Sequence, residues 1–130
     1  MENPFYQKPQ KNLRESRSSV HAEIPITVVY CCPSAKEEIR VHGRVADISE
    51  KGILFVSLEQ GIPPGAEVRA TFQLPCLDID PPIKFMGKAL RSKSIEGNQY
   101  ATGVEFKEIS TTNLRSIRSF VSLQQLGETL

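Results

Sequence analysis

The sequence has little of what membrane proteins and nucleic-acid-binding proteins depend on. Its 16 lysines and arginines face 15 acidic residues, so the net charge is only +1. Such a chain has no overall field to attract nucleic acid or an anionic membrane. No apolar run approaches the roughly 20 residues that span a bilayer, and the N-terminus lacks the apolar core of a secretory signal. We expect a cytoplasmic protein without membrane insertion or nucleic-acid binding.

Cysteine and catalytic motifs are also sparse. Cys31, Cys32 and Cys76 are odd in number and lack the paired C-x-x-C spacing of a zinc site, which favours reduced thiols. There is no Ser/His/Asp set, no H-E-x-x-H and no G-x-x-x-x-G-K-[ST] loop, and these are the usual signatures of hydrolases, metalloproteases and nucleotide phosphate sites. We therefore expect neither catalysis nor a metal or cofactor, and interpret the chain as a binding module.

The chain divides into a polar arm and one folded domain. A length of 130 residues suits one hydrophobic core. Residues 1–22 contain four lysines and arginines against two glutamates, together with prolines and serines, and this composition predicts a flexible basic arm. A plain solvated tail fits the same composition. Residues 23–126 are predicted to form a single domain.

Within that domain, apolar residues alternate with polar ones in short stretches bounded by turn signals. A period of two residues is typical of strands. Strands are predicted over residues 23–30, 39–48, 53–56, 67–74, 85–91 and 100–106. His42 falls inside one of them with no second ligand or nucleophile nearby, which favours a structural role. Six strands with short connections predict an all-β-dominated fold, either an antiparallel barrel or a strongly curved sheet.

The period changes near the C-terminus. Leu114, Ile117, Phe120 and Val121 recur at helical spacing behind three hydroxyl residues that could cap a helix. We predict a helix over about 110–126, stopped by Gly127. Its apolar stripe should pack over one end of the barrel, although a helix that binds a partner would show the same stripe.

One polar stretch, residues 47–52, lies between two predicted strands and has the pattern D-x-S-x-x-G. The Asp47 carboxylate can accept two hydrogen bonds from neighbouring donors, as the N1 and N2 edge of guanine offers, and Ser49 adds an adaptable contact. Gly52 permits a positive φ or close backbone approach. A turn capped by its own Asp or Ser side chain has the same pattern, so this stretch alone leaves both interpretations open.

The arm adds a second half to this hypothesis. Arg14 and Arg17 precede the first strand, and a guanidinium suits bidentate contacts with phosphate, contacts with guanine and stacking on a base. A basic arm that could fold over an acidic loop suggests a guanine nucleotide as the ligand.

Together these features resemble the PilZ domains of bacteria, which are receptors for cyclic di-GMP. The resemblance covers about residues 13–122. The family pairs an R-x-x-x-R arm with a [DN]-x-S-x-x-G motif, and Asp47, Ser49 and Gly52 match the second motif completely. The segments 87–91 and 103–106 and the closing helix are also similar to the family's six-stranded barrel and helix. The first motif departs from the pattern, because taking Arg17 as the second arginine places Leu13 where the first should be.

The resemblance implies a function and a set of roles. A cyclic di-GMP receptor or adaptor is implied, in which Arg14 and Arg17 clamp phosphate and stack on guanine while Asp47 and Ser49 hold the base edge. Arg44 and Arg91 are weaker candidates for lining the site. Ordering of the arm over the barrel would signal to a protein partner in motility, pilus or signalling machinery. The alternative is a degenerate domain that binds no nucleotide and acts as a protein–protein adaptor.

Overall fold

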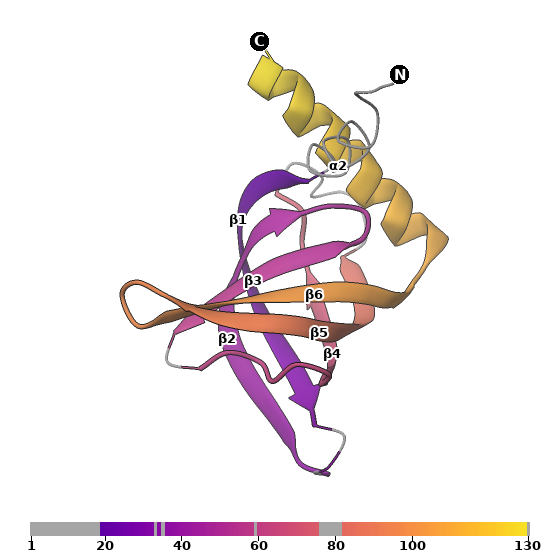
Figure 1. Ribbon diagram of the computed structural model, residues 1–130. Helices are drawn as coiled ribbons and strands as arrows, with labels where there is room; N and C mark the ends of the chain where they lie inside the picture. Colours follow the sequence, from indigo (N-terminus) through magenta and orange to yellow (C-terminus); the bar gives the residue numbers. More distant parts are fainter. Residues whose placement is uncertain (1–18, 33, 35, 59, 76–81, 130) are drawn as a thin grey trace, which may run out of the picture.

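The chain folds as a closed antiparallel β-barrel with one helix across an end (Figure 1). A computed structural model describes residues 19–32, 34, 36–58, 60–75 and 82–129. The elements in that part of the chain are β1 (Val20–Cys31), β2 (Glu38–Ile48), β3 (Gly52–Leu58), β4 (Glu67–Phe72), β5 (Ile83–Ile95), β6 (Gln99–Ile109) and α2 (Thr111–Thr129). The strands follow the order β1-β2-β3-β6-β5-β4 around the barrel. This confirms the predicted six-stranded barrel with a C-terminal helix.

Several strand boundaries differ from the sequence prediction, among them the start of β1 and the end of β5. Strand β1 begins at Val20, which pairs with Ile48 of β2, so residues 20–22 belong to the barrel and not to the arm. Strand β5 continues to Ile95, where it pairs with Gln99 of β6. The last residues of β5 are mostly exposed and do not alternate in burial, so this end of the strand carries no alternating pattern that a sequence could reveal. Residues 1–18, including most of the predicted arm, lie outside the described residues.

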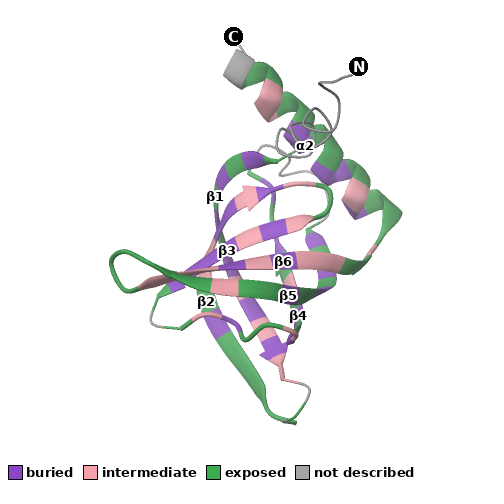
Figure 2. Cartoon of the chain, viewed as in Figure 1, coloured by how far each residue is buried: buried purple, intermediate pink, exposed green. Residues whose placement is uncertain are grey.

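The core fills the barrel lumen and extends beneath the helix. Buried side chains alternate with exposed ones along the strands (Figure 2), because successive residues of a strand point to opposite faces. The largest completely enclosed side chains include Phe55 and Phe85 from the barrel and Phe120 from the helix. One continuous cluster therefore holds sheet and helix together.

Helix α2 begins as predicted but does not stop at Gly127. The backbone N–H of Asn113 donates to Ser110 Oγ at 3.0 Å, so Ser110 is the N-cap. Gly127 is not among the residues with positive φ that commonly end helices, and an interior glycine costs only about 1 kcal/mol relative to alanine. The helix therefore runs on to Thr129. None of the helical structure described for this chain is long and apolar enough to cross a membrane.

The helix is fixed to the barrel by apolar burial and by one polar clasp. Ile117, Phe120 and Val121 are buried in the core cluster, which confirms the expected packing of the stripe. Asn113 Oδ1 accepts from the Lys84 backbone N–H at 2.9 Å, and its Nδ2 donates to Pro82 O at 3.2 Å. This buried amide ties the first helical turn to the start of β5.

Removing the buried ring of Phe120 should therefore destabilise the whole domain. Phe120 is 1% exposed, whereas Leu123 in the next helical turn is 55% exposed. We expect Phe120→Ala to lower the free energy of unfolding by about 3–5 kcal/mol, the usual cost of deleting a buried phenyl group. Leu123→Ala should cost less than about 1 kcal/mol. Urea denaturation of the two variants measures this, and equal losses would show that the helix is not part of the core.

Candidate functional site

The D-x-S-x-x-G motif forms a tight connection from β2 to β3. The Ser49 N–H donates to Gly52 O at 3.0 Å, and the Lys51 N–H donates to Ser49 Oγ at 3.1 Å. The Phe106 N–H of β6 donates to Lys51 O at 2.9 Å. Ser49 thus caps its own turn, as the simpler interpretation of the motif expected. The Asp47 carboxylate takes no part in these bonds, and the turn does not explain it.

Gly52 is needed because two backbones approach closely. It pairs with Glu105 of β6, and a Cβ atom at this position would overlap the carbonyl oxygen of Val104 and lie 3.1 Å from Glu105 Cα. Of the two reasons for glycine considered from the sequence, close approach therefore applies. A larger residue would push the loop, with Ser49, away from β6.

A β-bulge turns Asp47 to the outside of the barrel. Val45 is fully buried, and Asp47 two residues later would face the lumen in a regular strand. The β2–β3 register shifts between Val45 and Asp47, and the extra residue reverses the alternation beyond it. Ile48 is consequently buried, while the Asp47 side chain is 44% exposed.

Beside the motif lies an open groove of about 420 Å³ on the outer surface. Its floor is apolar and is formed by Leu54 of β3, by Gly103 of β6, which pairs with it, and by Leu90 of β5. The Leu90 side chain is 53% exposed. A Cβ atom on Gly103 would meet nothing within 4 Å, so the space between the two leucines is open. Asp47, Ser49 and Lys51 also line the groove. A flat ring could rest on this floor with a polar edge toward the carboxylate.

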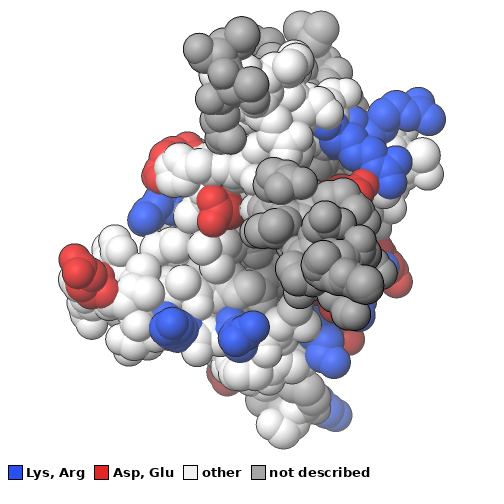
Figure 3. Space-filling model, turned by 45° about the horizontal axis from the view of Figure 1, so that its top comes forward, with Lys and Arg blue, Asp and Glu red and all other residues white. Residues whose placement is uncertain are grey.

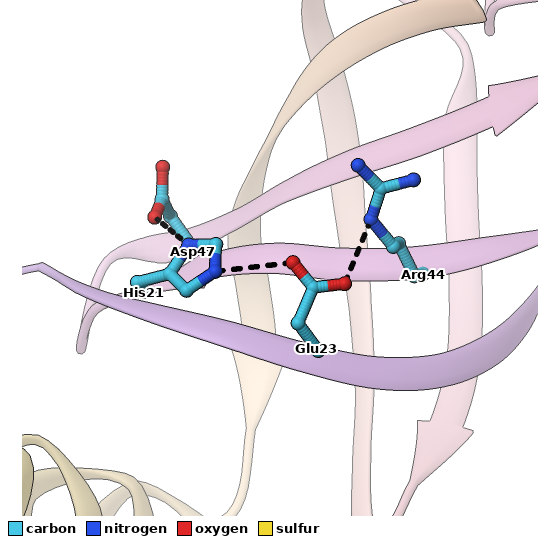
Figure 4. A network of polar contacts seen from close by, with 4 residues as sticks. All are labelled: His21, Glu23, Arg44 and Asp47. Atoms are coloured by element: carbon cyan, nitrogen blue, oxygen red, sulfur yellow. Dashed lines mark ion pairs between the residues drawn. The ribbon is translucent and has the colours of Figure 1, made fainter.

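A chain of charged groups links Asp47 to the first strand (Figure 4). His21 of β1 pairs with Asp47 in the ladder, and its Nδ1 lies 3.7 Å from Asp47 Oδ1. Its Nε2 lies 3.1 Å from Glu23 Oε2. The other oxygen of Glu23 is 3.0 Å from Arg44 Nε, in an ion pair that is not aligned as a hydrogen bond.

Helix α2 contacts the same loop from the opposite side. Arg118 Nε donates to Glu50 Oε1 at 2.5 Å. Because both side chains are substantially exposed, the direct contribution of this pair to stability is small. It links the tip of the loop to the helix. Figure 3 shows basic and acidic side chains interspersed over this end of the molecule, in keeping with a net charge of +1.

The structure brings together only part of the site named from the sequence. Asp47, Ser49 and Gly52 line one groove. Arg44 is engaged with Glu23, and Arg91 is an exposed neighbour of Gly103 in the ladder that does not line the groove. The residues Arg14 and Arg17 lie outside the described part of the chain, so their roles remain predictions.

The sequence did not point to Leu54, Leu90, Gly103 or His21, because their proximity to Asp47 depends on strand register.

A larger hollow of about 680 Å³ lies elsewhere on the barrel. It is lined by Cys31, Cys32, Lys88 and Lys107 among others, and Lys107 is paired with Glu105 at 3.1 Å. No group of three or more His, Cys, Asp or Glu side chains in the described ranges could hold a metal ion.

Burial, followed by the nearby Cys32 thiol, raises the pKa of Tyr30, so this phenol stays protonated at neutral pH.

The molecule is thus a closed six-stranded barrel that carries a polar loop beside an apolar groove. The family model of the PilZ domain matches residues 11–123, and the chain belongs to this family of receptor and adaptor domains. Comparison with curated protein sequences gives no match.

Solved structures that share the fold include two from well-defined bacterial sources. One is the inhibitor of motility MotI/DgrA of Bacillus subtilis, with a TM-score of 0.69 and 19% identity, matched over 87% of this chain and 52% of that chain. The present chain therefore spans about half the length of the Bacillus protein. The other is the PilZ domain of YcgR from Escherichia coli with c-di-GMP, with a TM-score of 0.52 and 14% identity over 81% of this chain and 86% of that chain.

The close approach at Gly52 makes a direct prediction about stability. Gly52→Ala should lower the free energy of unfolding by about 1–3 kcal/mol, because the added methyl group collides with the backbone of β6. Gly103→Ala is the matched control, since its methyl group would enter open space, and it should change stability by less than about 1 kcal/mol. Urea denaturation compares them. Equal stability of the two variants would contradict the packing of the loop on β6.

Proposed function

We propose that this protein binds cyclic di-GMP in the groove beside Asp47 and acts as a receptor that passes the signal to a partner protein. The observation that carries the proposal is a half-exposed carboxylate that the turn does not use, held beside an apolar floor. The N1 and N2 groups of guanine are two adjacent donors, and one carboxylate can accept both.

The groove suits the rest of the base as well. Leu54 and Leu90 offer apolar contact to the face of a purine, and Gly103 leaves room for the ring between them. Ser49 Oγ accepts one backbone hydrogen bond and keeps a further lone pair and its own proton for a ligand. These contacts account for both the flat faces and the polar edge of guanine.

The arm is proposed to supply the phosphate contacts. Ser19 lines the groove, and Arg17 is two residues before it, within about 7 Å of extended chain. Arg14 is five residues before Ser19, within about 17 Å. Both guanidinium groups can therefore reach a ligand in the groove, where bidentate contacts with phosphate would hold it. An arm that becomes ordered over the ligand would present a new surface to a partner.

The partner is proposed to belong to motility, pilus or signalling machinery, and the protein to act in the cytoplasm. The support is analogy of fold with a motility inhibitor and with a domain carrying c-di-GMP.

One observation favours a second candidate, an adaptor that binds no nucleotide. Leu13 occupies the position of the first arginine, with Arg14 one residue late. Partner capture that is unaffected by cyclic di-GMP would support this second candidate.

Isothermal titration with cyclic di-GMP tests the proposal. We expect measurable binding, and Asp47→Ala should weaken it at least about 10-fold, since each hydrogen bond to a charged group contributes about 1.5–3 kcal/mol. Glu96→Ala, which removes an exposed acid from the turn between β5 and β6, should bind like the parent. Absence of heat at tens of micromolar protein would refute the receptor proposal and favour the adaptor.

The arm has its own test. Arg17→Ala should weaken binding by about 10-fold or more, whereas Lys11→Ala, which removes the same charge from the arm, should have a much smaller effect. Leu13→Arg restores the R-x-x-x-R register and should tighten binding by about 10-fold. If titration shows the same affinity for Arg17→Ala and Lys11→Ala, and no gain for Leu13→Arg, the arm contributes only general charge.

A further inference from the structure

We propose that His21 controls access of the ligand to Asp47. When its imidazole is protonated it engages the carboxylate, and when it is neutral it releases it. This inference rests on the proposed function, because it concerns the acceptor that guanine would use. Its consequence is that cyclic di-GMP and a proton compete for the same site.

The geometry places the ring between two carboxylates. His21 lies opposite Asp47 in the β1–β2 ladder, with Nδ1 3.7 Å from Asp47 Oδ1 and Nε2 3.1 Å from Glu23 Oε2. Arg44 holds the far oxygen of Glu23 at 3.0 Å. The charged groups that face the ring are therefore Glu23 from its own strand and Asp47 from β2, with Arg44 behind Glu23 (Figure 4).

The number of N–H groups on the imidazole decides to how many of the two carboxylates it can donate a hydrogen bond. A neutral ring has one N–H and one bare nitrogen lone pair. Glu23 is the nearer acceptor and is held in place by Arg44, so the single proton belongs on Nε2. Nδ1 then faces Asp47 Oδ1 as one acceptor facing another, without attraction. Protonation places an N–H on Nδ1 as well and adds a positive charge, so the ring pairs with both carboxylates.

Pairing with the protonated ring conflicts with recognition of the base. Guanine needs both oxygens of Asp47 for its two adjacent donors, and Oδ1 is the oxygen that the ring engages. Ligand binding should therefore expel the proton from His21. By linkage, the free protein binds more protons than the complex, so affinity rises with pH across the range in which histidines ionise, near about 6.5.

A charged ring would also attract the phosphates of the ligand, which acts in the opposite direction. That attraction is weak here, because the His21 side chain is 67% exposed and its charge is screened by water and salt. The phosphates are also assigned to the arm arginines. Competition for Oδ1 is a short-range contact and should prevail.

The chain supplies a matched control in its only other histidine, His42. This residue lies on the same pair of strands, and its Nδ1 is 2.7 Å from the hydroxyl oxygen of Thr27 and not beside a carboxylate of the site. Replacing His42 removes an exposed imidazole from the same two-stranded ladder without altering the contacts of Asp47.

Calorimetric titration with cyclic di-GMP at about pH 6 and about pH 8 tests the competition. The parent protein and His42→Gln should bind about 3- to 10-fold more tightly at the higher pH, and buffers of different ionisation enthalpy should reveal release of a proton on binding. His21→Gln should show neither effect. Affinity that is equal or greater at the lower pH, or a pH dependence that survives in His21→Gln, would overturn the inference.

Carbon NMR of the ligand-free protein separates failure of this inference from failure of the proposed function. The carboxyl resonance of Asp47 should respond across the pH range in which histidines ionise, and this response should vanish in His21→Gln but persist in His42→Gln. Absence of the response would overturn the inference even if cyclic di-GMP binds. If the Asp47 resonance responds to pH but cyclic di-GMP does not bind at either pH, the proposed function is refuted. The His21–Asp47 ion pair would then exist without a ligand to compete with it.

Discussion

The site depends on the close contact between the backbone of Gly52 and that of β6. Because a side chain at this position would overlap the Val104 carbonyl, only glycine lets β3 begin directly against β6. The loop is then held by the Phe106 to Lys51 hydrogen bond on one side and by the Arg118 to Glu50 ion pair on the other. A loop fixed in this way presents Asp47 and Ser49 without having to pay the conformational entropy of ordering them when a ligand binds.

The bulge in β2 is the second requirement, and it connects core packing to function. It lets Val45 and Ile48 both enter the lumen although they are three residues apart, and it sends Asp47 outward between them. The bulge places Asp47 opposite Leu54, and a separate register shift between His21 and Ile24 of β1 places His21 opposite Asp47. A carboxylate, an imidazole and an apolar floor from four strands thus meet because two register shifts, one in each ladder of β2, interrupt the regular pairing.

The sequence could predict the barrel because period-two burial is a local signal, and it could predict the helix because its period changes at Ser110. It also predicted the motif half of the site, since Asp47, Ser49 and Gly52 are neighbours in the chain. The floor and His21 could not be found in this way, because their positions follow from register shifts that leave no local mark. Val20 and Ala22 continue the alternation of the first strand, but the start of β1 was missed because the polar composition that predicts an arm extends up to them. The helix was predicted to stop at Gly127, although a single glycine breaks a helix only weakly.

The central claim is that a guanine base binds between the Asp47 loop and the Leu54–Gly103 floor. The most direct measurement is a titration of isotope-labelled protein with cyclic di-GMP, followed by amide NMR. We expect the largest shifts on residues 47–54 and around Gly103, with His21 beside them. Shifts gathered instead around Cys31, Lys88 and Lys107, or no shifts at saturating ligand, would contradict it.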